Sequence, residues 1–181
     1  MGEGATRPPG GPHAEVVALQ QAGVRAYGGT LVCTLEPCRH VGRTGPCTSA
    51  IVAAGIARVV YACTDPSEDA AGGAEVLRAA EVDVEQVDVR VEPLEPWLHV
   101  QRTGLPFVTW KYAATLDGRS AAADGTSRWI TGEAARRDVH RLRAEVDAVV
   151  VGVGTVLADD PQLTVRPDPG HQPLRVVLDR Q

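Results

Sequence analysis

The sequence PHAE at residues 12–15 is followed by TLEPCRHVGRTGPC at residues 34–47, and these two stretches decide how the chain is interpreted. From there the residues predict three helices and three strands in alternation: helices over Ala14–Ala22, Pro46–Ala54 and Glu75–Ala80, and buried or β-branched strands over Thr30–Leu35, Arg58–Ala62 and Val82–Val87. Alternation of this kind predicts an α/β sheet with helices packed against it.

A stretch rich in proline and glycine around Pro93 and Pro106 predicts a boundary between two regions. We expect a first domain over residues 1–92, a linker over residues 93–105 and a second domain over residues 106–181. The second region is also predicted to be α/β: a strand over Phe107–Ala114, a helix from about Gly132 to Val146 with Thr131 as its N-cap, and buried strands over Asp147–Val153 and Leu174–Leu178.

Composition narrows the class of partner. The net charge is −5 and only 4% of residues are aromatic, whereas a nucleic-acid binder normally has a basic face with stacking aromatics. We therefore expect a small-molecule substrate and no nucleic acid.

No apolar run approaches the ~20 residues that span a bilayer, and residues 1–12 contain no hydrophobic stretch of the kind found in a signal peptide. The sequence thus predicts a cytoplasmic protein that does not bind membranes.

The four cysteines fall into two classes. Without an export signal they favour metal binding or buried thiols over disulfides. Cys33 and Cys63 lie within predicted strands, so we interpret them as core thiols. Cys38 and Cys47 instead flank a loop, and together with His13 they supply three ligands for Zn²⁺. Three protein ligands leave the fourth tetrahedral position for water, as a catalytic zinc site requires.

Glu15 completes this predicted site. It lies two residues after His13, too close to ligate the same ion comfortably but well placed to contact the bound water. Zinc can lower the pKa of water from ~15.7 to ~7, and a carboxylate beside it can move the proton to a leaving amine. His13 and Cys47 stand at predicted helix starts, where partial positive charge favours a thiolate. A chance pattern or a purely structural metal is the alternative interpretation.

The long spacing between the two cysteines distinguishes this chain from most zinc-dependent nucleobase deaminases. Most zinc-dependent nucleobase deaminases place two residues between these cysteines, whereas eight stand between Cys38 and Cys47. This loop closely resembles that of the bifunctional deaminase–reductase family of riboflavin biosynthesis. The same family is indicated by four further stretches: HAEVVAL at 13–19, AAGIARVV at 53–60, KYAATLDGR at 111–119 and GVGTVLADDPQLTVR at 152–166.

The resemblance implies a cytidine-deaminase-like three-layer α/β/α domain followed by the start of a dihydrofolate-reductase-like α/β domain. It implies that zinc-dependent deamination of a phosphoribosylaminopyrimidine, with Glu15 as catalytic residue, is followed by NADPH-dependent reduction of the ribosyl chain. By position it implies two sets of contacts in the second region: NADPH contacts at Ala113, Trp129, Thr155 and Asp159, and substrate contacts at Ser127, Arg143, Leu163 and Arg166.

The sequence also departs from that family. Residues 1–12 stand where members have opening strands, and the chain stops at Gln181, where their reductase domain continues. We therefore expect a chain truncated at both ends, with an unpaired sheet edge and an uncovered face in its first domain. The alternatives are a non-catalytic zinc-binding remnant and another zinc nucleobase or nucleoside deaminase. The oligomeric state is left open, with a homo-oligomer paired through the reductase sheet as one option.

Overall fold

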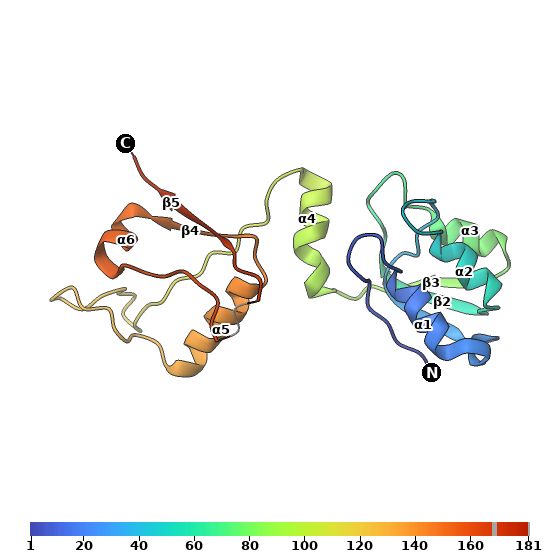
Figure 1. Cartoon of the computed structure of the whole chain (residues 1–181), viewed down its shortest axis with the longest axis horizontal. Coiled ribbons are helices and arrows are strands. Elements are labelled where there is room, and N and C mark those ends of the chain that lie inside the picture. Colours follow the sequence, from blue (N-terminus) through green and yellow to red (C-terminus); the bar gives the residue numbers. More distant parts are fainter. Residues whose placement is uncertain (168–169, 181) are drawn as a thin grey trace. The chain divides into compact units, whose positions relative to one another are not determined.

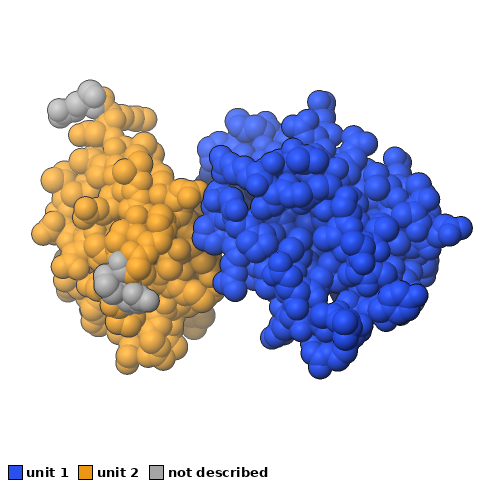
Figure 2. Space-filling view, turned by 45° about the vertical axis from the view of Figure 1, so that its right-hand side comes forward, with its two compact units in different colours: residues 1–108 blue, residues 109–181 orange. Residues whose placement is uncertain are grey.

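The computed structural model describes residues 1–167 and 170–180. The chain divides into two compact units, Met1–Val108 and Thr109–Gln181, which Figure 2 colours separately. Both units combine parallel strands with helices, so the predicted α/β class is confirmed. None of the described helices is both long enough and apolar enough to cross a membrane.

The first unit contains a parallel sheet of three strands in the order β1-β2-β3 (Figure 1). Its elements in chain order are helix α1 (Ala14–Ala22), a 3-10 turn η1 (Gly23–Ala26), β1 (Thr30–Leu35), α2 (Cys47–Ala53), β2 (Arg58–Cys63), α3 (Gly73–Ala79), β3 (Asp83–Gln86), η2 (Glu92–Leu94) and α4 (Glu95–Thr103). The predicted bounds of α1 and β1 agree with these to the residue, and those of the other four elements differ by one or two residues.

One face of this sheet carries the core. The register aligns Leu31 with Val59 and Val59 with Val84, so these three side chains point to the same face. They pack with Ile51 of α2 and Leu77 of α3, both of which are fully buried. Burying an aliphatic side chain of this size stabilises a fold by about 1.5–3 kcal/mol. The three helices are thus held against one face of the sheet.

The opposite face of the sheet is open in the described part of the chain. Val32, which alternates with the core-facing residues of β1, is 74% exposed. Arg58 and Glu85 form an ion pair across β2 and β3. The described part of this unit therefore shows two of the three layers that the resemblance implied, with β1 and β3 as its edge strands.

Helix α4 lies in the segment 93–105 that was predicted as a linker. Pro96 stands in its first turn, where a missing N–H has no intrahelical partner to lose. Gly104 ends it in the left-handed region (φ 69°), a conformation that glycine adopts without steric cost. Pro96 and Gly104, which belong to the stretch that predicted a boundary between two regions, thus mark the two ends of a helix.

The second unit contains helix α5 (Glu133–Ala144), strand β4 (Ala148–Gly152), helix α6 (Val153–Asp159) and strand β5 (Leu174–Leu178). Strands β4 and β5 pair in parallel, and α6 packs against both of them. The predicted helix and these two strands are present, within two residues of their predicted bounds.

Three details of the second unit differ from prediction. Phe107–Ala114 forms no strand, since none of the backbone hydrogen bonds or strand pairings among the described residues involves it. Trp110 and Tyr112, both exposed, stack on each other instead. Helix α5 takes Gly132 rather than Thr131 as its N-cap, with no side-chain cap bond. Strands β4 and β5 have no buried residue, because a sheet of two strands presents too little surface to enclose them.

Candidate functional site

Three ligand atoms from separate parts of the chain converge in the first unit. The Nδ1 of His13 lies 3.3 Å from the Sγ of Cys47 and 3.5 Å from the Sγ of Cys38, and the three atoms lie within 4.8 Å of one another. A tetrahedral zinc ion, with Zn–S of about 2.3 Å and Zn–N of about 2.0 Å, separates its nitrogen and sulfur ligands by roughly 3.5 Å. The arrangement therefore fits one zinc ion with a fourth position left for water.

Local structure explains how these atoms meet. His13 is the N-cap of α1 (φ −71°, ψ 162°), and Cys47 is the first residue of α2, which packs against α1. Cys38 lies on the loop after β1 and is held from two sides. Its Sγ accepts the backbone N–H of Cys47 at 3.4 Å, and its carbonyl accepts the N–H of Thr48 at 3.2 Å. Two helix starts and one loop therefore build the site.

The two thiols share a proton unequally. The pKa of Cys38 is lowered to about 5, chiefly because the Cys47 thiol donates a hydrogen bond to it. The pKa of Cys47 is raised by that same bond and by complete burial. A bound divalent cation overrides this difference, since a coordinating thiol is deprotonated outright.

Glu15 lies on the first turn of α1 beside these ligands, in hydrogen-bonding contact with the Cys47 thiol. Burial raises the pKa of its carboxyl group. A carboxylate whose pKa is moved toward neutral can both accept and release a proton during one reaction cycle. The position and the shifted pKa both suit the proton-transfer role that the sequence suggested.

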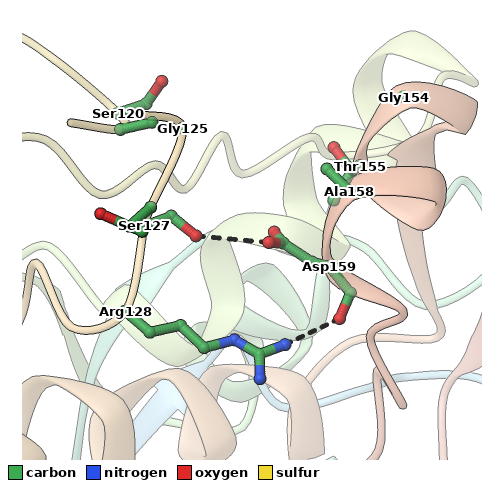
Figure 3. A pocket seen from close by; sticks show the side chains of 10 residues that line it. Ser120, Gly125, Ser127, Arg128, Gly154, Thr155, Ala158 and Asp159 are labelled. Carbon is green, nitrogen blue, oxygen red and sulfur yellow. Dashed lines mark hydrogen bonds between the residues drawn. The ribbon is translucent and has the colours of Figure 1, made fainter. Parts of the chain in front are cut away.

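A cavity of about 570 Å³ lies in the second unit. Four chain segments border it, and its lining includes Ser127, Arg128, Thr155 and Asp159. Figure 3 shows the Ser127 hydroxyl directed at the Asp159 carboxylate, 3.3 Å away, and the Arg128 guanidinium directed at the Asp159 carbonyl, 2.8 Å away. Gly154 and Thr155, in the first turn of α6, also line the cavity, and both residues are exposed. The cavity thus offers both charged and polar groups to a ligand.

The predicted NADPH contacts divide between this cavity and other places. Thr155 and Asp159 line it, and so does Ser127, which had been assigned to the substrate. Trp129 is not among the lining residues; its ring is covered by the Arg136 guanidinium, 4.2 Å from the ring centroid. Ala113 is partly buried and also lies outside the lining.

The other predicted substrate contacts gather around the loop that follows α6. Arg143 donates to the Thr164 carbonyl at 3.2 Å, and the backbone N–H of Arg166 points to the Nδ1 of His140 at 3.2 Å. Burial of Arg143, and secondly the positive charge of Arg166, lower the pKa of the Arg143 guanidinium. Leu163 has a positive φ of 56°, and only 7% of the residue is exposed.

Sequence reasoning gave no role to three residues that the structure places at these sites. Glu36, quoted only as part of the cysteine motif, is a buried carboxylate beside Cys38. Arg128 lines the cavity in the second unit, and His140 contacts the loop after α6. A charged residue directly before a Pro-Cys ligand was a usable signal for Glu36, whereas the other two depend on chain segments that meet only in the fold.

Comparison with protein families identifies two regions. Residues 2–63 match the family model of the cytidine and deoxycytidylate deaminase zinc-binding region, and residues 106–181 match that of the RibD C-terminal domain. The first match contains all three ligand residues and Glu15, and the second contains the cavity and the loop after α6.

The curated relatives that match this chain over both regions share one name. The chain is 55% identical to the riboflavin biosynthesis protein RibD of Mycobacterium tuberculosis over 189 residues, which cover all of this chain and 56% of the relative. It is 46% identical to RibD of Escherichia coli, covering 54% of that protein. The chain therefore spans about half the length of the curated relatives it matches.

Solved structures agree with this. RibD of Acinetobacter baumannii superposes with a TM-score of 0.84 at 47% identity, over 99% of this chain and 53% of that one. A Thermotoga maritima structure named as a diaminohydroxyphosphoribosylaminopyrimidine deaminase and 5-amino-6-(5-phosphoribosylamino)uracil reductase superposes with a TM-score of 0.85 at 43% identity, over 95% of this chain and 51% of that one.

Proposed function

Because the chain belongs to the RibD family of riboflavin biosynthesis proteins, we propose that it serves that family's two reactions. In the first unit this is zinc-dependent hydrolytic deamination of 2,5-diamino-6-(5-phosphoribosylamino)pyrimidin-4-one. In the second unit it is NADPH-dependent reduction of the ribosyl side chain of the deaminated product. The observation that carries the proposal is the convergence of His13, Cys38 and Cys47 beside the buried carboxyl of Glu15.

The proposed deamination replaces an exocyclic amino group by a carbonyl oxygen. Water adds to the ring carbon that bears the amine, the C–N bond breaks, and ammonia leaves. His13, Cys38 and Cys47 would hold the zinc ion. When bound, zinc supplies a Lewis acid that makes water a nucleophile at neutral pH.

Glu15 performs the proton transfers in this proposal. It takes the first proton of water on attack and delivers it to a ring nitrogen, and it then takes the remaining hydroxyl proton of the adduct and delivers it to the departing amine. The raised pKa of its carboxyl supports this, because a carboxylate with a higher pKa is a stronger base and accepts a proton from water more readily. Its contact with Cys47, one of the proposed zinc ligands, supports the same role.

The proposed reductase contacts rest on the second unit. We assign the cavity at Thr155 and Asp159 to NADPH, together with Trp129 and Ala113 from the family pattern. Arg143 and Arg166 suit the substrate phosphate, because guanidinium groups bind phosphate through two parallel charge-assisted bonds. Ser127 and the Leu163 backbone are the remaining proposed substrate contacts. The ligands are small molecules, and we propose no nucleic acid or membrane partner and leave open a homo-oligomer.

A two-part assay tests the deaminase proposal. The purified chain should contain about one zinc ion per molecule by atomic emission, and should release ammonia from the diaminopyrimidine substrate. Ammonia release from cytidine, deoxycytidylate or guanine, with none from the diaminopyrimidine, would contradict the proposed substrate. Zinc without ammonia from any of them would favour a zinc-binding chain that is not catalytic by itself.

A further inference from the structure

The cysteine ligand Cys38 lies on a loop, where no strand ladder fixes its position. The segment of residues 65–74, which we call the clamp, contacts the loop on both sides of this ligand. On one side the Glu36 carboxylate accepts the N–H of Ala74 at 2.9 Å through Oε1 and the N–H of Asp65 at 3.3 Å through Oε2. On the other side the N–H of Arg39 donates to the Ala70 carbonyl at 3.3 Å.

Glu36 is a buried carboxylate although it is not one of the proposed metal ligands. Its side chain is buried, with only 4% of the residue exposed, and its partners are two backbone N–H groups rather than a cation. A buried carboxylate is costly unless its oxygens are hydrogen-bonded, and hydrogen bonds to an ionised acceptor are about twice as strong as neutral ones. Both oxygens therefore tie the chain directly before Pro37 and Cys38 to the two ends of the clamp.

Gly73 makes the closest approach between the clamp and the loop. A Cβ added at this residue would lie 1.7 Å from the carbonyl oxygen of Pro37, 2.9 Å from its carbonyl carbon and 3.3 Å from the Cγ2 of Thr48. The nearest of these atoms is backbone and cannot rotate away. The carbonyl of Pro37 belongs to the peptide bond that leads into Cys38, so any side chain at position 73 must displace that peptide.

We propose that Glu36 and Gly73 are positioning residues for the Cys38 ligand, so that the clamp sets the geometry of the zinc site without touching the metal. The inference rests on the proposed zinc site and adds residues that hold one of its ligands. Partners that orient metal ligands in this way typically change metal affinity by about 10–100-fold when they are removed.

Two pairs of variants of the full chain test this. Gly73→Ala is compared with Gly45→Ala, which adds the same methyl group within the cysteine loop at a position where the new atom meets nothing within 4 Å. Glu36→Gln is compared with Glu75→Gln, an exposed glutamate on the first turn of α3. Glutamine at position 36 keeps the volume and one acceptor oxygen but turns an amide N–H₂ toward one of the two backbone donors.

Two readouts separate positioning from simple destabilisation. The first is the zinc dissociation constant, measured by competition with a chromophoric chelator; the second is the visible absorption spectrum of the Co²⁺-substituted chain, which reports ligand geometry. We expect Gly73→Ala and Glu36→Gln to weaken zinc binding by about tenfold or more and to shift the cobalt bands. Gly45→Ala and Glu75→Gln should match wild type in both.

Wild-type zinc affinity and an unshifted cobalt spectrum in Gly73→Ala and Glu36→Gln would overturn the inference, even if both variants unfold more easily. Should Gly73→Ala fail to fold, Glu36→Gln decides alone. Neither readout uses turnover, so a wild-type chain that binds zinc but releases no ammonia would count against the proposed deamination and leave the positioning role to be judged by these titrations.

Discussion

The Nδ1 of His13 lies 3.3 Å from the Sγ of Cys47, although 34 residues separate them in the chain. Both residues stand at the start of a helix, and the two helices pack side by side against one face of a parallel sheet. The proposed zinc site is therefore a consequence of how α1 and α2 pack together, and its stability is tied to the core of the first unit.

Replacing Glu15 by glutamine should separate metal binding from catalysis. We expect Glu15→Gln to retain about one zinc per chain, because the three ligand atoms are untouched, and to lose ammonia release by about 10²–10⁴-fold, the usual contribution of a general acid–base group. Zinc content and ammonia release are measured on the same sample, with Glu75→Gln as the control. Loss of zinc in Glu15→Gln would show that Glu15 supports the ligands instead.

Removing the metal should loosen the first unit and leave the second unchanged. At a free zinc concentration about a thousandfold above its dissociation constant, binding adds about 4 kcal/mol to the free energy of unfolding. We expect chelation to speed hydrogen exchange of the buried Ile51 amide, with no change in the amides of α5. In Cys38→Ala the Ile51 amide should exchange as fast as in the chelated wild type. In Cys63→Ala, which keeps all three proposed ligands, it should exchange as slowly as in the zinc-loaded wild type. Equal exchange rates before and after chelation would show that the fold does not depend on the metal.

Cys33 should be a slow nucleophile. Burial, and secondly the charge of Glu15, raise the pKa of its thiol to about 12, whereas a free thiol has a pKa of about 8.5. The thiolate fraction at pH 8 is then lower by about 10³, and it rises tenfold for each pH unit up to about 12. Mass spectrometry after iodoacetamide treatment should find Cys33 alkylated at least a hundredfold faster in urea than in the folded chain. Equal rates would mean that Cys33 is open to solvent.

Asp159 should matter more to nucleotide binding than its neighbour does. Asp159 lines the cavity and Asp160 does not, so Asp159→Asn and Asp160→Asn form a matched pair, and asparagine tolerates the positive φ of residue 160. Losing one charge-assisted hydrogen bond should weaken NADPH binding by about tenfold or more in Asp159→Asn only. Fluorescence titration measures NADPH binding. An equal loss in both variants would show that the negative charge of the region matters and that Asp159 makes no specific contact with NADPH.

The helices and strands of the first unit could be predicted closely because their signals are local. Gly23 and Gly55 end helices at predictable places, and β-branched residues fill the strands. Burial in the second unit could not be predicted in this way. Ala148–Gly152 and Leu174–Leu178 are apolar enough for buried strands, yet burial depends on how many other strands and helices cover them. For the same reason Phe107–Ala114 has the composition of a strand without forming one.

The sequence by itself determined which residues we propose for the metal chemistry, because an imidazole, two thiols and a carboxylate at these spacings suit few other purposes. The family followed from the eight residues between Cys38 and Cys47 and from the stretches that follow them. Only the tertiary structure decided that the ligand atoms of His13, Cys38 and Cys47 lie within 4.8 Å of one another and which predicted contacts share one cavity. It also brings the hydrogen bonds of Glu36 and the close approach of Gly73 to the chain that leads into Cys38. These are distances between segments far apart in the chain, and no local pattern of residues encodes them.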